Sequence, residues 1–338
     1  MAQVQVEMEQ FIGKSIRESI LLGAQLLQKA GAEEARHQAE QLFMHMMEVD
    51  RSYLLLHGAE QFPAIHLERW VALLTRKASG EPLQYITGSQ WFYSREFVVT
   101  PAVLIPRPET ELLVEALLKA VDELWPPTLG AAHDDALFVS AAQPAEAAGQ
   151  VPVVPTILDV GTGSGAIAVT LAAERPGYRI CASDISPDAL DVARANAERH
   201  GVSRHVAFAM GDLLAPLLHT TSSGASRLEH AGFAVDVLVS NPPYIPAADI
   251  AELQREVRDH EPLLALQGGT DGLDPYRQMI ETLARLSEVP RIVAFELGIY
   301  QPPLVVEMLR QLQCWDSIRI IDDYAGIQRH VIAIRYEK

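Results

Sequence analysis

Residues 157–166 read Ile-Leu-Asp-Val-Gly-Thr-Gly-Ser-Gly-Ala, and this stretch decides the fold. The apolar run at 157–160 is typical of a buried strand, and it leads directly into a loop with glycine at 161, 163 and 165. A helical pattern follows over residues 165–175. Glycine lets the backbone approach a ligand closely, and a helix N-terminus presents free N–H groups to an anion. The stretch therefore predicts a strand, a ligand-binding loop and a helix in direct succession.

Strand and helix patterns alternate from residue 156 to the end of the chain. Further strands are predicted at residues 179–183, 206–209, 235–240, 292–297, 317–321 and 331–336, and further helices at 187–200, 247–258, 275–288 and 301–313. This alternation is typical of a mainly parallel sheet that is covered by helices on both faces. Because only residues 322–330 join the last two strands, we expect those two to pair antiparallel.

The first third of the chain has a different organisation. Apolar residues between about 11 and 78 recur at helical spacing, which predicts a small helical domain over residues 1–80. Aromatic and β-branched residues on both sides of 94–96 predict a β-hairpin linker over 81–107. The main domain then spans 108–338. Its interruption at 126–155 is rich in alanine and proline and has no Lys or Arg, which predicts a flexible insertion.

Composition excludes several classes of protein. The 338 residues include 27 Lys and Arg against 44 Asp and Glu, a formal net charge of −17, whereas a surface that binds nucleic acid normally carries a basic excess. Cys181 and Cys314 are the two cysteines and stand far apart, which excludes a disulfide framework. The eleven histidines lack metal-ligand spacing, so no metal is expected. With no signal peptide and no apolar run near roughly 18–20 residues, we predict a cytoplasmic protein without membrane contact.

A carboxylate at the end of the second predicted strand completes a candidate nucleotide site. Asp184 follows the strand at 179–183, and the carboxyl ends of parallel strands meet at one edge of a sheet. A carboxylate at this position can accept two hydrogen bonds from a ribose diol. The glycine loop and the acid fit either a nicotinamide cofactor or S-adenosylmethionine, because the spacing of Gly161 and Gly163 also satisfies the dinucleotide fingerprint.

The tetrapeptide Asn241-Pro242-Pro243-Tyr244 follows the fourth predicted strand and so belongs to the same edge. The side-chain oxygen of Asn241 and the carbonyl of Pro242 can accept the two hydrogens of a planar –NH2 group. The ring of Tyr244 can pack on the plane of that group, which aims its nitrogen at a methyl donor. We therefore predict catalytic roles for Asn241, Pro242 and Tyr244, and these favour S-adenosylmethionine because a nicotinamide enzyme has no use for them.

This tetrapeptide resembles that of methyltransferases that act on planar amides and exocyclic amines, including adenine-amine DNA methyltransferases. Further segments, in the same order along the chain, make it similar to the release factor glutamine methyltransferase (PrmC/HemK) family. These segments are PLQYITG at 82–88, LIPRPETE at 104–111, LDVGTGSG at 158–165, HEP at 260–262, GGTDGL at 268–273 and DYAGIQR at 323–329. The resemblance covers nearly the whole chain outside 126–155 and 219–232.

The resemblance implies a Rossmann-like class I S-adenosylmethionine-dependent methyltransferase fold, an α/β domain with a seven-stranded, mostly parallel sheet. It implies that residues 1–80 bind the release factor and that 108–338 carry the catalytic site. The activity implied is in-line methyl transfer to the side-chain amide nitrogen of the glutamine in the Gly-Gly-Gln motif of bacterial class 1 peptide chain release factors, leaving S-adenosyl-L-homocysteine. The chain is expected to act as a monomer.

Site residues carry over position by position. The methyl donor is assigned to Gly161, Thr162, Gly163, Ser164, Gly165, Asp184, Asp212, Leu213 and Asn241. The glutamine is assigned to Asn241, Pro242, Pro243 and Tyr244. Leu213 stands where some members carry an aromatic residue, so an aliphatic contact with the adenine is expected. No metal ligand is assigned.

Two alternatives stay open beside the nicotinamide enzyme. A methyltransferase of exocyclic amines in nucleic acid shares the tetrapeptide but needs a basic target-binding domain, and residues 1–80 have no excess of Lys and Arg. A non-catalytic binding module of this fold would tolerate loss of Asn241. Four glutamates near these motifs could line the pocket, but helix capping or solvation explains each at least as well, so they are left out of the catalytic set: Glu109, Glu111, Glu261 and Glu296.

Overall fold

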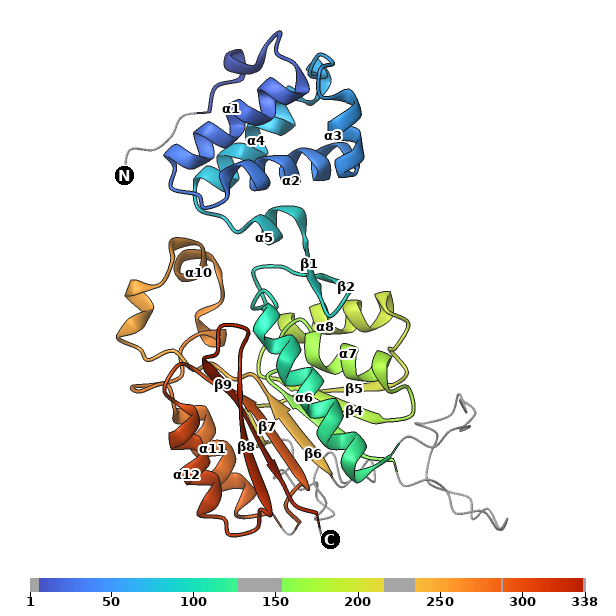
Figure 1. Cartoon of the computed structure of the whole chain (residues 1–338), viewed down its shortest axis with the longest axis vertical. Coiled ribbons are helices and arrows are strands. Elements are labelled where there is room, and N and C mark those ends of the chain that lie inside the picture. Colours follow the sequence, from blue (N-terminus) through green and yellow to red (C-terminus); the bar gives the residue numbers. More distant parts are fainter. Residues whose placement is uncertain (1–5, 127–153, 216–234, 287, 337–338) are drawn as a thin grey trace, which may run out of the picture. The chain divides into compact units, whose positions relative to one another are not determined.

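The computed structural model describes residues 6–126, 154–215, 235–286 and 288–336 (Figure 1). These residues belong to two compact units, one made of residues up to 89 together with 253–260, and the other of 90–252 together with 261–338. The predicted insertion at 126–155 lies, apart from its ends, outside the described residues. No helix in the described ranges is both long and apolar enough to cross a membrane.

The first unit is helical, as the apolar spacing predicts. Its helices are α1 (Ile16–Lys29), α2 (Ala35–Met47), α3 (Arg51–His57), α4 (Leu67–Ala78), α5 (Leu83–Thr87) and α10 (Arg255–His260), with short 3-10 turns at Met8–Phe11 and Ala64–His66. A capping box between Ser15 and Glu18 begins α1. Trp70 of α4 is fully buried, with the rings of Phe11 and Phe43 edge-on to it. α10 is held to α4 by the buried Lys77, which forms an ion pair with Glu256.

The second unit contains the predicted seven-stranded sheet. Its strands are β3 (Thr156–Val160), β4 (Arg179–Asp184), β5 (Val206–Met210), β6 (Val237–Ser240), β7 (Ile292–Glu296), β8 (Ser317–Asp322) and β9 (Gln328–Ile334). They lie in the order β5-β4-β3-β6-β7-β9-β8. The first five run parallel, and β9 runs antiparallel to both β7 and β8, as expected from their short connection. The predicted hairpin forms from β1 (Ser89–Phe92) and β2 (Arg95–Val98).

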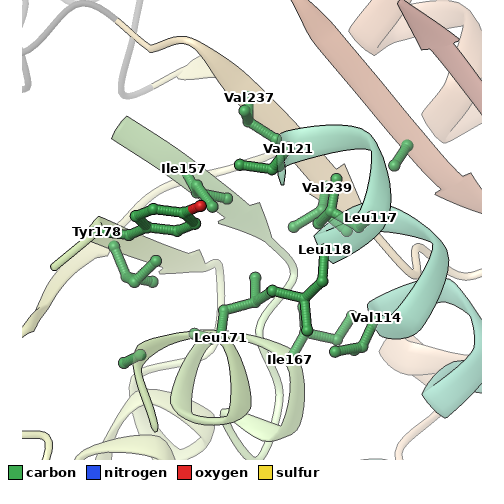
Figure 2. Close-up of a cluster of buried hydrophobic side chains, with 14 of the residues drawn as sticks. Val114, Leu117, Leu118, Val121, Ile157, Ile167, Leu171, Tyr178, Val237 and Val239 are labelled. Carbon is green, nitrogen blue, oxygen red and sulfur yellow. The ribbon is translucent and has the colours of Figure 1, made fainter. Parts of the chain in front are cut away.

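Helices cover both faces of this sheet (Figure 1). They are α6 (Pro108–Leu124), α7 (Ala166–Glu174), α8 (Pro187–Arg199), α11 (Asp274–Leu283) and α12 (Pro302–Arg310). Because side chains alternate along a strand, β3 sends Ile157 into a core with α6 and α7 and sends Leu158 into a core with α11 and α12. Figure 2 shows the first of these cores, where Leu117 and Val121 of α6 lie among strand and α7 side chains. The seven-stranded order with helices on both faces is that of the class I methyltransferase fold.

The prediction of one helix over residues 247–258 is wrong. The segment instead forms a 3-10 turn at Asp249–Glu252, a break at residues 253 and 254, and then α10. The break coincides with the boundary between the two compact units. The two halves of the segment therefore pack in different environments, which a single apolar periodicity along the sequence does not reveal.

Candidate active site

Three strand ends bring the sequence-predicted motifs to one place. In the sheet register, Val160 of β3 lies beside Ser183 of β4 and Ser240 of β6. The next residues along each strand direction are the glycine loop, Asp184 and Asn241. They line one cavity of about 420 Å³ in the second unit. Nine of the predicted residues line it: Gly161, Thr162, Gly163, Ser164, Asp184, Asp212, Leu213, Asn241 and Pro243.

The first three N–H groups of the glycine loop donate hydrogen bonds to other parts of the protein. The N–H groups of Gly161 and Thr162 donate to the carbonyl of Ser183 at 2.8 and 2.9 Å, and the N–H of Gly163 donates to the Asp184 carboxylate at 2.9 Å. These three amides are therefore not available to an anion, whereas the sequence-based expectation of free N–H groups concerned the N-terminus of the following helix, α7. What the loop offers a ligand is a wall of backbone at Gly161 and Gly163 and of the small side chains of Thr162 and Ser164, held in place by these hydrogen bonds.

Gly165 has a packing role. Its φ is +81°, and an added Cβ would lie 3.1 Å from the Cβ of Ala193 on α8. It is not among the residues that line the cavity, although the resemblance assigns it to the donor. The absence of a side chain at this position lets α7 begin close against α8.

The carboxylates of Asp184 and Asp159 accept hydrogen bonds from the glycine loop. Asp184 accepts from the N–H groups of Gly163 and Ser186, one at each oxygen, and keeps a further lone pair on each. Asp159 is fully buried, which raises its pKa to about 7, and it accepts the hydroxyl proton of Thr162 at 2.6 Å. Asp184 thus retains the capacity to accept hydrogen bonds from two hydroxyls of a ligand, whereas Asp159 fixes the loop.

Asn241 is oriented by a chain of hydrogen bonds. Its side-chain nitrogen donates to the hydroxyl of Thr110 at 3.1 Å, and that hydroxyl donates to Oε2 of Glu296 at 2.6 Å. Glu296 is only 1% exposed, and burial raises its pKa to about 7. The prediction that this glutamate is solvated or caps a helix is wrong.

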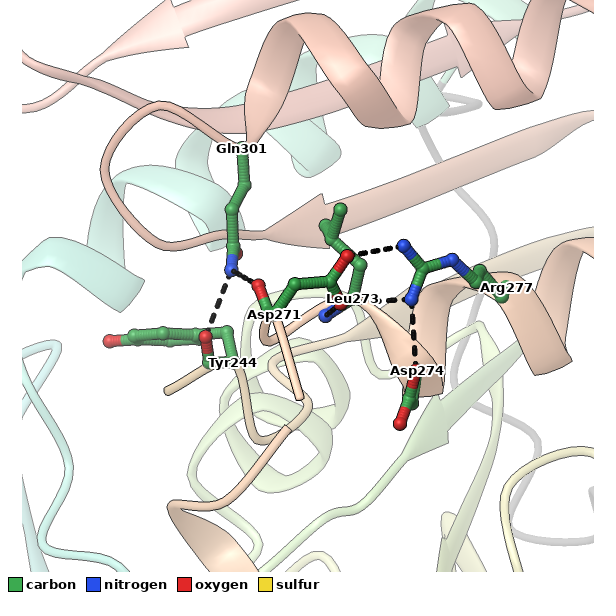
Figure 3. Close-up of polar contacts among 6 residues, drawn as sticks. All are labelled: Tyr244, Asp271, Leu273, Asp274, Arg277 and Gln301. Carbon is green, nitrogen blue, oxygen red and sulfur yellow. Dashed lines mark hydrogen bonds and ion pairs between the residues drawn. The ribbon is translucent and has the colours of Figure 1, made fainter. Parts of the chain in front are cut away.

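Tyr244 is held from two sides. Nη2 of Arg329 on β9 donates to its hydroxyl at 2.9 Å, and the guanidinium carbon lies 5.3 Å from the centre of the ring. The side chain of Gln301 donates to its carbonyl at 2.9 Å, as Figure 3 shows. Neither Tyr244 nor the buried Pro242 is among the residues that line the cavity. Both contribute to the shape of the loop that presents Asn241 and Pro243 to it.

The segment 268–274 packs against the backbone of the Asn-Pro-Pro-Tyr loop. A Cβ on Gly268 would lie 2.6 Å from the carbonyl oxygen of Pro243, and one on Gly272 would lie 2.1 Å from that of Tyr244. Asp271, in the same segment, forms an ion pair with Arg277 of α11, drawn in Figure 3. These two glycines therefore allow an approach of backbone to backbone that any side chain would prevent.

A second buried glutamate, Glu261, holds residues 105–107 beside the cavity. Glu261 is 6% exposed and forms an ion pair with Arg107, whose side chain lines the cavity. Its other oxygen accepts from the N–H of Ile105 at 3.3 Å. The assignment of Glu261 to solvent or to capping is also wrong. Glu111 accepts from the N–H of Tyr93 at 2.9 Å and so joins α6 to the hairpin turn.

The residues of this cavity fit S-adenosylmethionine. Its lining combines the buried carboxylate of Asp184, able to accept from a ribose diol, with apolar side chains suited to an adenine. Leu213 lines the cavity and packs against the core beneath it, and its contact with an adenine stays a prediction. In the described part of the chain, no cluster of three or more His, Cys, Asp or Glu side chains is arranged to hold a metal ion.

Comparison with known families divides the chain into two matched regions. A family described as the PrmC N-terminal domain matches residues 19–88, and one described as a methyltransferase domain matches residues 155–256. Among solved structures, the hMettl16 catalytic domain in complex with MAT2A 3'UTR hairpin 6 has a TM-score of 0.48 and 16% identity, covering 72% of this chain and 76% of that one. A likeness this distant does not inform the site.

Curated relatives match nearly from end to end. The release factor glutamine methyltransferase of Moorella thermoacetica is 37% identical over 324 residues, which cover 96% of this chain and 100% of the relative. The protein of the same name from Bacillus subtilis is 36% identical over 321 residues, covering 95% of this chain and 98% of the relative. Identity of this extent along both chains shows common descent with the same architecture. The chain belongs to the release factor glutamine methyltransferase family.

Proposed function

We propose that this protein transfers a methyl group from S-adenosylmethionine to the side-chain amide nitrogen of the glutamine in the Gly-Gly-Gln motif of bacterial class 1 peptide chain release factors. One observation carries the proposal: Asn241, placed to receive a planar amide, opens onto the same cavity as the glycine loop and Asp184. The names of the full-length relatives favour a protein glutamine over an exocyclic amine of nucleic acid as the acceptor.

The donor side of the site consists of the glycine loop, Asp184, Asp212 and Leu213. Asp184 would accept from the ribose hydroxyls, and Leu213 would pack on the adenine. When bound, S-adenosylmethionine supplies a methyl group on a positively charged sulfur, which makes that carbon open to attack. The loop, already tied to Ser183 and Asp184, needs no rearrangement to receive it.

The acceptor side consists of residues 241–244. Since the side-chain nitrogen of Asn241 donates to Thr110, its oxygen is the atom left to accept an N–H of the glutamine amide. Although neither residue lines the cavity, the carbonyl of Pro242 would accept the second N–H, and the ring of Tyr244, fixed by Arg329, would restrict the orientation of the amide plane. The amide would then be oriented by hydrogen bonds that a differently shaped group does not satisfy.

Positioning and electrostatics carry the chemistry. An amide nitrogen is a weak nucleophile because its lone pair is delocalised, so it must be held about 3–3.5 Å from the carbon it attacks. Positive charge develops on this nitrogen as the bond forms, and the oxygens of Asn241 and Pro242 stabilise it. The more acidic N–H can then lose its proton to solvent. No strong base is required for this sequence.

Each of the three segments of the chain would have its own role in this reaction. Residues 1–80 would bind the release factor, 81–107 would link the domains, and 108–338 would carry the reaction. The protein would act in the cytoplasm, as a monomer and without direct contact to nucleic acid. The match of residues 19–88 to the PrmC N-terminal domain supports the separate role given to the N-terminal domain.

The test is methyl incorporation from labelled S-adenosylmethionine into a purified bacterial release factor, beside a release factor variant whose loop glutamine is changed to alanine. We expect label in the first protein and none in the second. Equal label in both would place the methyl group elsewhere. Label in neither, with donor binding demonstrated, would refute the assignment of the acceptor.

A further inference from the structure

A relay of hydrogen bonds connects Asn241 with the protein interior, and its middle member, Thr110, also lines the cavity. It runs from the buried Glu296 at the end of β7, through Thr110 in the first turn of α6, to the Asn241 side chain after β6. Three elements that are far apart in the sequence thus contribute one residue each. Glu296 and Thr110 are 1% and 5% exposed, so water does not compete for these bonds.

The relay has a direction. The Thr110 hydroxyl has one proton, which it donates to Glu296, so toward Asn241 it can only accept. It therefore receives the NH2 end of the Asn241 amide, and the oxygen of that amide points the other way. The backbone of Glu296 is itself fixed, because the hydroxyl of the buried Tyr276 donates to its carbonyl at 2.6 Å.

We propose that Glu296 and Thr110 are positioning residues that set which end of the Asn241 amide faces the substrate, an inference that rests on the proposed function. A carboxylate at 296 can only accept, which forces the whole relay into one direction. A group that can donate at 296 lets the Thr110 proton turn toward Asn241. Asn241 would then present its NH2 to the cavity, where a donor would meet the N–H donors of the glutamine.

Charged and titratable groups around Glu296 come from α6, α11, β9 and the Asn-Pro-Pro-Tyr loop. Burial is the largest cause of the raised pKa of Glu296, about 7, and Glu109 of α6 raises it further. Hydrogen bonds with Thr110 and with Asn241 itself lower it, as does Arg329 of β9, so Asn241 also contacts the carboxylate directly. His330 of β9 has a nitrogen 3.8 Å from the carboxylate, but burial lowers its pKa to about 4, so it is neutral near pH 7. Tyr244 and Tyr276 also face the carboxylate, and the pKa of each is raised. The relay is therefore expected to lose its direction as the pH falls through about 7.

The kinetic test uses three variants in the full-length protein. Thr110→Val keeps the shape and removes the hydroxyl, whereas Thr110→Ser keeps the hydroxyl. We expect the first to lower kcat about tenfold or more, the size of one lost hydrogen bond in the transition state, with KM for S-adenosylmethionine changed less than about twofold. The second should recover most of that loss. Glu296→Gln should lower kcat and remove the decline of kcat below about pH 7 that the wild type shows.

A second measurement needs no turnover. The ¹H–¹⁵N signal of the Asn241 side-chain amide in the wild type should shift with a midpoint near pH 7; Glu296→Gln should abolish the shift and Thr110→Val should reduce it. A signal that does not respond to pH or to Thr110→Val would overturn the relay. So would Thr110→Val with wild-type kcat, or with a loss that Thr110→Ser does not recover. If the wild type does not methylate a release factor yet its Asn241 signal titrates in this way, the proposed function fails and the relay stands.

Discussion

Gly272→Ala is expected to inactivate the enzyme through the backbone of the Asn-Pro-Pro-Tyr loop. A Cβ at this position would lie 2.1 Å from the carbonyl oxygen of Tyr244 and 2.4 Å from the side-chain nitrogen of Gln301. Real Cβ atoms essentially never come within 3.0 Å of another heavy atom, so the Tyr244 carbonyl must move by roughly an ångström. The same carbonyl accepts the Gln301 hydrogen bond, which would be disrupted as well.

The size of the effect follows from this displacement. A shift of about 1 Å in groups that position a reactant costs about 10²-fold in rate. We therefore expect kcat to fall about a hundredfold. The affinity for S-adenosyl-L-homocysteine should change little, because the glycine loop and Asp184 are built on other strands. Both quantities can be measured on one preparation, by methyl incorporation into a release factor and by calorimetry.

Gly326→Ala is the matched control. Gly326 has φ +75° against +78° at Gly272, so both alanines bear the same backbone strain. Gly326 lies in the exposed turn between β8 and β9, and an added Cβ there would meet nothing within 4 Å. The control should lose stability of about 1 kcal/mol and keep its rate. Equal kcat values in the two variants would refute the argument, because strain alone would then account for the result.

Three further predictions concern the two ends of the cavity and the carboxylate behind it. Asn241→Ala should abolish turnover while donor binding stays measurable by calorimetry; near wild-type turnover would contradict the role of Asn241. Asp184→Asn should weaken donor binding roughly 10–100-fold, since hydrogen bonds to a charged group contribute about 1.5–3 kcal/mol each, and an unchanged Kd would contradict the ribose assignment. Glu296→Gln should become more stable relative to the wild type as the pH rises from about 5 to 8. The pKa of Glu296 is raised in the folded protein from 4.5 to about 7, so ionisation costs up to about 3 kcal/mol above that pH and nothing below the unfolded pKa; parallel pH profiles of thermal unfolding would contradict this.

Much of the fold could be predicted from the sequence because the strands of the sheet are recognisable as apolar runs and the motifs stand directly after them. β3, β4 and β6 are short apolar runs bounded by turn residues, and the glycine loop, Asp184 and Asn241 stand at their carboxyl ends. Parallel strands place such ends at one edge, which is why the order of motifs along the chain suffices to assign Asp184 and Asn241 to one site. The boundary between compact units at residues 253–260 left no such signal.

The support behind the site was harder to predict. Glu261 meets Ile105 and Arg107, which are more than 150 residues away in the sequence, and nothing local to residue 261 indicates it. Glu296 did leave a signal: a carboxylate inside the apolar run 292–297 of a strand covered on both faces must be buried. The internal use of the loop amides also depends on a neighbouring strand, since the carbonyl that accepts from Gly161 belongs to Ser183.

The most direct test of the central claim is to locate the methyl group. A purified bacterial release factor is incubated with this enzyme and S-adenosylmethionine, and the peptide that contains its Gly-Gly-Gln motif is sequenced by mass spectrometry. The account predicts one added methyl group on the side-chain nitrogen of that glutamine, and none when Asn241→Ala replaces the wild type. A methyl group on another residue of the release factor, or the same modification with Asn241→Ala, would contradict it.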